Sequence, residues 1–166
     1  MQVSKRTLRK LVRQIKVVAF DFDGVFTDNR VLVTEDGREA VFCWRGDGLG
    51  LAMIKNKGLY PLVISTEINP IVTVRCRKLK IPCIQGCKDK LQALKQEAEK
   101  LGVSLGKVSF VGNDTNDTDC LKNVAFPICV SDSHPKVLTL GKYITKTKGG
   151  FGAVREVCDL FLNLTK

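Results

Sequence analysis

Short apolar runs alternate with amphipathic segments along most of the chain. Apolar runs of the length typical of buried parallel strands lie at residues 15–20, 60–64 and 107–111, with shorter ones at 128–130 and 143–144. Helix-forming segments, two of them followed by a glycine stop, lie at residues 48–57, 69–79, 90–101, 117–124 and 153–164. This alternation predicts one α/β domain, a Rossmann-like parallel sheet with helices on both faces.

One segment departs from this alternation and predicts a β-hairpin directly after the first strand. Residues 30–34 alternate between apolar and polar side chains, and residues 39–42 resume a strand-like pattern. Glu35, Asp36 and Gly37 lie between them and supply the chemistry of a tight turn. We therefore expect a hairpin that projects from the α/β domain.

The positive charge of the chain is concentrated at its N-terminus. The 166 residues carry 27 Lys and Arg against 17 Asp and Glu, a formal net charge of +10, and six of the basic side chains lie in residues 1–16 without any acidic one. Such a segment is typical of proteins that bind nucleic acid or an anionic membrane surface, but it has no aromatic residue to stack on a base. We expect a basic arm or linker at 1–14, or a short amphipathic helix, before a single domain at 15–166. Neither nucleic acid nor a membrane is an expected partner.

The remaining composition indicates an ordinary globular protein of a reducing compartment. The chain is 44% hydrophobic and 27% charged, and it has neither an apolar window long enough to span a membrane nor the pattern of a secretory signal. Its seven cysteines are scattered without a Cys-x-x-Cys pair, and His134 is the only histidine, so zinc ligands at suitable spacing are missing. We expect free thiols and a cytoplasmic location.

Polar residues that carry chemistry follow three of the predicted strands. Asp21 and Asp23 follow the first, Ser65 the second and Gly112–Asp117 the third, while Lys90 opens the helix before the third. Because the carboxyl ends of parallel strands meet at one edge of a sheet, these side chains are expected to converge. Hard oxygen donors suit Mg²⁺, which neutralises charge on a transferring phosphoryl group. A carboxylate beside it has the chemistry of a nucleophile.

Taken together, these segments resemble the motifs of a known superfamily of phosphatases. Residues 17–28 are similar to the first motif of the haloacid dehalogenase superfamily, and Ser65, Lys90 and Gly112–Asp117 match its second, third and fourth motifs. The similarity is closer to the branch without a cap domain. That branch includes 3-deoxy-D-manno-octulosonate 8-phosphate phosphatases, nonulosonate 9-phosphate phosphatases and the phosphatase-like domain of acylneuraminate cytidylyltransferases. The hairpin and the segments Arg45–Gly48, Ser131–Pro135 and Gly149–Glu156 extend the resemblance over residues 15–164.

The resemblance implies a Mg²⁺-dependent sugar-acid phosphatase that works through an aspartyl-phosphate intermediate. It makes Asp21 the nucleophile and a metal ligand, and Asp23 the general acid and base with its carbonyl on the metal. Ser65 and Lys90 would bind the phosphoryl group. The residues that it implies for the rest of the metal shell are Asn113, Asp114 and Asp117. Members of this branch form homotetramers in which the hairpin and the C-terminal segment help to close a neighbouring site.

Two positions depart from the superfamily pattern. The residue after Gly112 is usually an aspartate ligand, whereas Asn113 keeps a carbonyl oxygen and removes one negative charge. Thr66 and Glu67 stand where octulosonate phosphatases usually carry glycine and arginine, and Glu67 resembles the nonulosonate type. A small anionic sugar phosphate with eight or nine carbons is the expected substrate.

The substrate-binding residues are expected around the mouth of this site. Arg75 and Lys78 are three residues apart on one helix, so they share a face that either binds a substrate carboxylate or is simply solvated. Gly150 belongs to a glycine-rich segment that opens a helix and is able to cradle an anion. With Thr66 and Glu67, these residues are the predicted substrate contacts.

Asn113 and the linker-like N-terminus leave a second interpretation open. The chain could be a weakly active or inactive oligomerisation or regulatory domain that is fused to, or associates with, an acylneuraminate cytidylyltransferase. Retention of Asp21, Asp23, Ser65 and Lys90 favours the phosphatase, because a silent domain has no need of all four.

Overall fold

A six-stranded parallel sheet forms the centre of the protein in the computed structural model, which describes residues 4–164. Its strands, from one edge to the other, are β5 (Cys83–Ile84), β4 (Tyr60–Ile64), β1 (Val17–Phe20), β6 (Val108–Gly112), β7 (Phe126–Cys129) and β8 (Tyr143–Ile144). All neighbouring strands run parallel. The order places the first strand between β4 and β6, as a doubly wound α/β fold requires, so the predicted fold class is confirmed.

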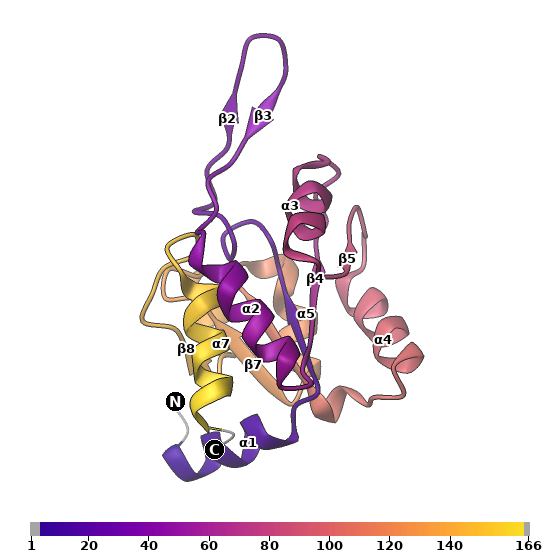
Figure 1. The fold of residues 1–166 in the computed structure, drawn as a ribbon, viewed down its shortest axis with the longest axis vertical. Coiled ribbons are helices and arrows are strands. Elements are labelled where there is room, and N and C mark those ends of the chain that lie inside the picture. The colour runs from indigo at the N-terminus through magenta and orange to yellow at the C-terminus, as the bar shows by residue number, and fades with distance from the viewer. Residues whose placement is uncertain (1–3, 165–166) are drawn as a thin grey trace.

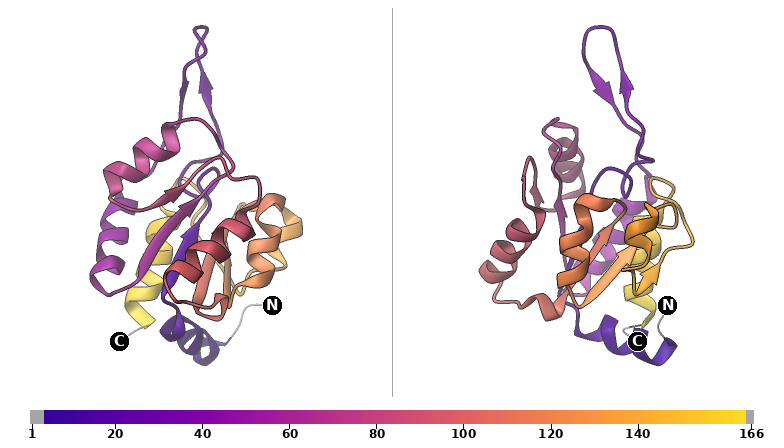
Figure 2. Two further views of the ribbon diagram at one scale, coloured as in Figure 1. Left: turned by 90° about the vertical axis from the view of Figure 1, so that its right-hand side faces the viewer. Right: turned by 180° about the vertical axis from the view of Figure 1, so that it is seen from behind.

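Helices cover both faces of this sheet (Figure 1, Figure 2). One face is covered by α1 (Lys5–Gln14), α2 (Gly46–Asn56), α3 (Ile71–Leu79) and α7 (Ala153–Leu164), and the other by α4 (Lys90–Lys100), α5 (Thr118–Asn123) and α6 (Pro135–Leu138). Two short 3₁₀ turns lie at Leu105–Lys107 and Thr115–Asp117. Alternation along β1 explains the two layers, since Val18 and Phe20 join the core beneath α2 and α7, whereas Val17 and Ala19 join the core beneath α4 and α5.

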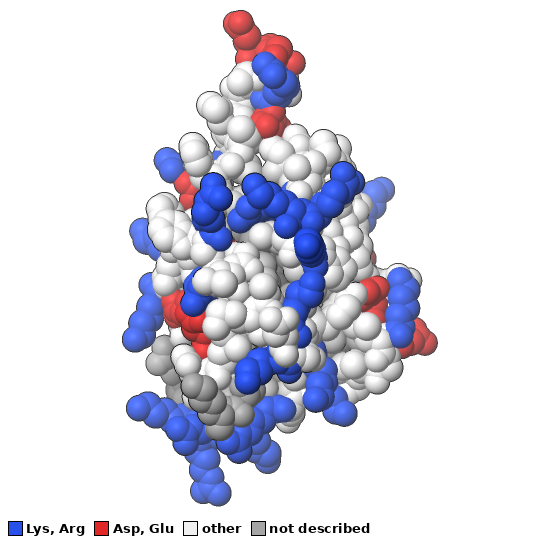
Figure 3. All heavy atoms as spheres, viewed as in Figure 1, with Lys and Arg blue, Asp and Glu red and all other residues white. Residues whose placement is uncertain are grey.

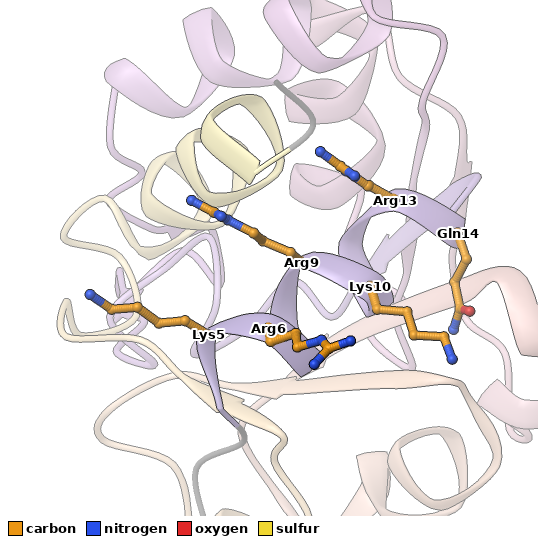
Figure 4. Close-up of a pocket in the computed structure, with 6 residues that line it drawn as sticks. All are labelled: Lys5, Arg6, Arg9, Lys10, Arg13 and Gln14. Atoms are coloured by element: carbon orange, nitrogen blue, oxygen red, sulfur yellow. The ribbon is translucent and has the colours of Figure 1, made fainter.

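The basic N-terminal segment is an amphipathic helix in the structure. The side chain of Ser4 caps α1 by accepting a hydrogen bond from the Thr7 amide at 3.2 Å, and Val12 is buried where α1 packs against α7. The side chains of Lys5, Arg6, Arg9, Lys10, Arg13 and Gln14 border a shallow hollow on the outer side of the helix (Figure 4). Among residues 4–164, no helix is long and apolar enough to cross a membrane.

The predicted hairpin is present, with strands of only two residues each. Leu32–Val33 (β2) and Glu39–Ala40 (β3) pair antiparallel, and their side chains are exposed because the hairpin projects from one end of the molecule (Figure 1). The sequence pattern predicted longer strands, and it did not predict β5 or α6. All seven cysteines lie within the described residues and are free thiols, as expected.

Candidate active site

The carboxyl ends of three neighbouring central strands form a pocket of about 290 Å³. Asp21 directly follows β1, Ser65 follows β4 and Asn113 follows β6, so the sheet register brings these residues together. The residues that line the pocket are Asp21, Asp23, Asn29, Ser65, Thr66, Asn113, Asp114, Thr115 and Asn116. The strand-end residues singled out in the sequence therefore converge in space.

A buried lysine joins two carboxylates beneath this pocket. The Lys90 Nζ lies 2.7 Å from Asp21 Oδ1 and 2.7 Å from Asp117 Oδ1, and only 2% of the Lys90 side chain is exposed. Lys90 reaches this position because Asp89 caps α4 by accepting a hydrogen bond from the Gln92 amide at 2.9 Å, which fixes the first turn of the helix. The Asp21 Oδ1 also accepts a hydrogen bond from the Phe22 amide at 2.7 Å. Asp21 is thus held in one orientation.

The balance of burial and neighbouring charges raises the pKa values of both Asp21 and Lys90. Burial, reinforced by the Asp117 carboxylate, raises the pKa of Asp21 to about 7, although Lys90 acts against the shift. Burial alone would lower the pKa of Lys90, but the Asp21 and Asp117 carboxylates outweigh burial and raise it. Lys90 therefore stays positively charged. Any further positive charge beside Asp21 would favour the ionised form of its carboxyl group.

Asp23 lies at the mouth of the pocket rather than beneath it. Thr27 Oγ1 donates to Asp23 Oδ1 at 3.4 Å and accepts a hydrogen bond from the Gly24 amide at 3.1 Å, which shapes the turn after β1. Burial and then the Glu67 carboxylate raise the pKa of Asp23. A half-buried carboxyl with a raised pKa is suited to deliver and recover a proton.

The oxygen atoms around Asn113 fit a hard divalent cation. The terminal amide group of Asn113 lies 2.9 Å from the carbonyl oxygen of Asp23 and 3.3 Å from Asp21 Oδ2. A Cβ on Gly24 would lie 2.0 Å from this amide, so glycine leaves the space that the side chain occupies. A carboxylate, a carbonyl and an amide oxygen are ligands that Mg²⁺ accepts. Within residues 4–164, no three His, Cys, Asp or Glu side chains gather as a metal site, so a cation here would depend on the Asp23 carbonyl and Asn113.

Asp117 and Asp114 organise the loop after β6. Both Asp117 oxygens are engaged, Oδ1 with Lys90 and Oδ2 with the amides of Asn113 at 2.9 Å and Asp114 at 3.3 Å. Asp114 Oδ1 caps the following 3₁₀ turn through the Thr115 amide at 2.6 Å, and Asp114 lines the pocket. Asp117 therefore holds the loop that carries Asn113, and Asp114 lies at the surface of the pocket.

Thr66 and Glu67 connect this pocket to a second one of about 330 Å³. Thr66 lines both pockets, whereas Glu67 lines the second, together with residues of the hairpin base and the start of α3. The Glu67 Oε1 accepts hydrogen bonds from the amides of Ile68 at 2.7 Å and Asn69 at 2.8 Å, so it also shapes the turn that precedes α3. The second pocket has room for a ligand that extends out of the first.

Within a single chain, the other predicted substrate contacts do not line either of these two pockets. Arg75 and Lys78 line a neighbouring hollow that the hairpin residues 39–43 share with α3, and Arg75 donates to the Trp44 carbonyl at 3.2 Å. The Gly150 amide donates to the Val25 carbonyl at 3.1 Å, and a Cβ on Gly150 would lie 2.3 Å from the Asp28 amide. Gly150 therefore supports the turn after β1, and none of these three residues lines the pocket that contains Asp21.

Several residues of the site were not predicted. Asn29 lines the pocket, but it belongs to a loop whose return to the sheet edge no periodic pattern reveals. Thr115 and Asn116 also line the pocket; they lie in the Gly112–Asp117 segment that was expected to converge there, although neither was named as a site residue. Thr27 is buried beside Asp23. The sequence could have indicated this contact, because Thr27 follows Asp23 by four residues in the same turn. Asp132 accepts a hydrogen bond from the Gly149 amide at 3.0 Å and so holds the glycine-rich turn.

Comparison with known proteins agrees with this geometry. Residues 78–157 match the family described as haloacid dehalogenase-like hydrolase. The 3-deoxy-D-manno-octulosonate 8-phosphate phosphatase of Escherichia coli K12 is 33% identical over 149 residues, which cover 89% of this chain and 79% of that protein. The enzyme of the same name from Salmonella typhi is 32% identical over 161 residues, which cover 96% of this chain and 85% of that protein.

Solved structures share the fold over nearly the whole chain. A haloacid dehalogenase family hydrolase from Streptomyces avermitilis is 44% identical with a TM-score of 0.89, covering 92% of this chain and 89% of the other. The 3-deoxy-D-manno-octulosonate 8-phosphate phosphatase of Moraxella catarrhalis was solved with magnesium, phosphate and KDO. It is 33% identical with a TM-score of 0.93, and the match covers 97% of this chain and 93% of that one. The identity and coverage of these relatives, together with the placement of all four motifs, show that the chain belongs to the haloacid dehalogenase-like hydrolases, in the branch of the 3-deoxy-D-manno-octulosonate 8-phosphate phosphatases.

Proposed function

We propose that the protein is a Mg²⁺-dependent phosphatase that hydrolyses a sugar-acid phosphate at Asp21. The observation that carries the proposal is the arrangement of this one side chain, whose Oδ1 contacts Lys90 at 2.7 Å while Oδ2 faces the Asn113 amide and the open pocket. A carboxylate held in this way has part of its charge neutralised by Lys90 and faces the pocket in which it would attack phosphorus. The relatives named as phosphatases support the same chemistry.

The first half of the reaction transfers the phosphoryl group to Asp21. One oxygen of its carboxylate attacks phosphorus, the bond from phosphorus to the sugar oxygen breaks, and Asp23 gives its proton to the departing sugar oxygen. In this proposal Lys90, Ser65 and Thr66 stabilise negative charge on the phosphoryl group. Ser65 and Thr66 line the pocket, and Lys90 contacts Asp21 beneath it. In the second half, Asp23 takes a proton from water as that water attacks phosphorus, which releases inorganic phosphate and restores Asp21.

The residues that would hold Mg²⁺ are Asp21, the carbonyl of Asp23, and Asn113, with Asp114 nearby and Asp117 orienting the loop. When bound, the cation supplies positive charge that favours the ionised form of Asp21 and neutralises the phosphoryl oxygens. This role matters here because burial and Asp117 raise the pKa of Asp21 to about 7 when only the protein's own charges act on it.

The second pocket and the relatives support a proposal for the substrate class. We propose an octulosonate 8-phosphate or a nonulosonate 9-phosphate, the first favoured by the named relatives and the second by Glu67 beside the leaving-group side of Asp23. Asn29 and Thr66, which line the first and second pockets alike, are placed to bind hydroxyls of the sugar chain. Arg75 and Lys78 would meet a substrate carboxylate only if it extended past the hairpin or if a second subunit reshaped that hollow.

We also propose that the functional unit is a homotetramer assembled through the hairpin. Val31, Leu32 and Val33 are 51%, 59% and 60% exposed on a hairpin that projects from the domain, and Phe42 at its base is 77% exposed. Exposed apolar side chains gathered on one projection are typical of an interface. A second copy of the chain is the proposed partner, and the predicted contribution of the hairpin to a neighbouring site remains part of this proposal.

Parallel phosphate-release assays on the eight- and nine-carbon ulosonate phosphates test this function. We expect turnover of one of them in Mg²⁺, loss of turnover when EDTA removes the cation, and recovery when Mg²⁺ is restored. Turnover that persists in EDTA would contradict metal dependence. If neither ester is hydrolysed although Mg²⁺ binds, the second interpretation, a regulatory domain of a cytidylyltransferase, would be favoured instead.

A further inference from the structure

The side chain of Asn113 lies where the cation of the proposed function would bind. It is 7% exposed, and its terminal amide group faces the Asp23 carbonyl at 2.9 Å and Asp21 Oδ2 at 3.3 Å. Both partners are acceptors, so the favourable orientation turns the amide nitrogen toward them and makes two N–H donations. The opposite orientation places the amide oxygen against two other oxygens, an arrangement that a cation between them would stabilise.

The backbone and the packed part of the Asn113 side chain are held in place, so the remaining motion of the terminal amide is rotation by half a turn. Its backbone amide donates to Asp117 Oδ2 at 2.9 Å, and its carbonyl accepts a hydrogen bond from the His134 amide at 2.8 Å. On the remaining side, a Cβ on Gly24 would lie 2.6 Å from the Asn113 Cγ, so the side chain is packed against the Gly24 backbone. Rotation of the terminal amide by half a turn exchanges donor and acceptor while these contacts stay in place.

We propose that Asn113 is a two-position element that replaces the cation when the cation is absent. In the metal-free protein its N–H groups hold Asp21 Oδ2 and the Asp23 carbonyl in place, and in the metal-bound protein it turns and offers its oxygen as a neutral ligand. The inference rests on the proposed Mg²⁺ site. An aspartate in this position has no such second role, because an ionised carboxylate only accepts hydrogen bonds and would repel Asp21.

This proposal has opposite consequences for stability and for metal affinity. With Asn113 the metal-free site is already ordered, but Mg²⁺ has to displace two hydrogen bonds and finds one fewer negative charge. With an aspartate in its place, the metal-free site would be strained by like charges and would bind Mg²⁺ more tightly. The asparagine therefore gives a site that keeps its shape when Mg²⁺ is scarce and takes up Mg²⁺ only at higher concentration.

The Asn113→Asp variant tests this element without relying on catalysis. We expect its thermal unfolding temperature in EDTA to fall by about 4 °C or more relative to wild type, and its Mg²⁺ affinity, from thermal shift against Mg²⁺ concentration, to rise about ten-fold. Asn116→Asp is the matched control, because Asn116 lines the same pocket and is exposed. The control should change the unfolding temperature in EDTA by less than about 2 °C.

A second measurement uses the wild-type chain alone. The Asn113 side-chain amide signals in a nitrogen-15 spectrum, assigned by their loss in Asn113→Asp or Asn113→Ser, should exchange slowly with water in EDTA and shift when Mg²⁺ is added. Equal unfolding temperatures of wild type and Asn113→Asp in EDTA, or amide signals that stay in place while Mg²⁺ binds, would overturn the proposal. A wild-type protein that is inert in the phosphate-release assay would contradict the proposed function alone, because the EDTA measurements do not depend on turnover.

Discussion

Lys90 shows how single residues of the site serve both stability and chemistry. Its ammonium is almost completely buried and lies 2.7 Å from a carboxylate oxygen of both Asp21 and Asp117. A buried ion pair contributes little net stability when intact, but removal of one partner leaves uncompensated charge inside the protein. Here the loss of Lys90 would leave two carboxylates facing each other.

We therefore expect Lys90→Gln to destabilise the fold as well as to impair turnover. The loss in free energy of unfolding should be on the order of 3 kcal/mol, measured by urea denaturation at pH 7 in EDTA. Lys88→Gln, two residues earlier and exposed, is the control and should stay within about 0.5 kcal/mol of wild type. Equal stability of Lys90→Gln and wild type would mean that Lys90 does not hold these carboxylates.

Sequence reasoning located residues of this kind because each one directly follows a strand or opens a helix. Asp21, Ser65 and Asn113 come together because they end adjacent parallel strands, which is a consequence of topology. Arg75 and Lys78 share a helix face as predicted, but the direction of that face depends on the packing of α3 beside the hairpin, which the helical period does not specify.

At the scale of elements, the contact between α2 and α7 contains a buried carboxyl group that serves no predicted chemistry. Asp47 is fully buried in the first turn of α2, and its Oδ1 accepts a hydrogen bond from the Arg155 amide near the start of α7 at 3.0 Å. Within residues 4–164 its Oδ2 has no hydrogen-bond partner, and burial raises the pKa of Asp47 to about 7 despite Arg155 and Arg75 nearby. The two helices approach closely here, since a Cβ on Gly50 would lie 2.9 Å from Cys158 Cβ.

This raised pKa predicts the direction of a pH effect. Because the folded protein binds the Asp47 proton more tightly than the unfolded chain, the stability from Asp47 is present below pH 4 and is lost as the pH rises to about 7. Asp47→Asn keeps an acceptor for the Arg155 amide and does not titrate. We expect the variant to match wild type near pH 4 and to be more stable at pH 8 by on the order of 3 kcal/mol.

Urea denaturation of both proteins at several pH values measures this difference. Asp21 titrates in both proteins, so its contribution to the pH dependence of stability cancels in the comparison. A wild-type protein that is more stable than Asp47→Asn at pH 8 would show that Asp47 is ionised and paired with an arginine. The sequence predicted a helix over residues 48–57 and so left Asp47 just before it, whereas α2 includes Asp47 in its first turn. The sequence did not indicate burial either, because the contact with Arg155 joins residues more than one hundred positions apart.

The boundaries of the elements were predictable where local chemistry sets them. The last helix begins at Ala153 and ends at Leu164 as the pattern predicts, and Gly58 adopts a positive φ of 81° just after α2. The short strand β5 was not predicted, because two half-buried residues at a sheet edge leave no periodic signal. The hairpin strands are shorter than predicted, and the side chains of both strands are exposed.

At the scale of the whole molecule, a concentration of positive charge lies at the end opposite the pocket that contains Asp21. The basic helix α1 leads into the start of β1 (Figure 1), whereas residues that line the pocket follow the other end of that strand. Figure 3 shows basic side chains gathered at the end formed by α1 and in a band across the middle of this face, with acidic and basic side chains together at the hairpin tip. Six of the basic side chains behind the net charge of +10 lie at residues 5–16, remote from the pocket that contains Asp21.

The hairpin should determine the assembly of the molecule. Replacing Leu32 and Val33 together by glutamate and threonine should convert the proposed tetramer to an 18.4 kDa monomer in sedimentation experiments. Both side chains are exposed in the single chain. The free energy of unfolding of the variant should therefore lie within about 0.5 kcal/mol of that of wild type measured at a dilution at which wild type is monomeric. A wild-type protein that sediments as a monomer at all concentrations would contradict the assembly.

The most direct test of the central claim, that Asp21 is the nucleophile of a phosphatase, compares wild type with Asp21→Asn under identical conditions. Phosphate release from the preferred ulosonate phosphate is measured in Mg²⁺, with circular dichroism to show that both proteins are folded. We predict turnover by wild type and a loss of at least about 10³-fold in Asp21→Asn. Equal rates of phosphate release from the two proteins, whether both are active or both inert, would contradict the claim.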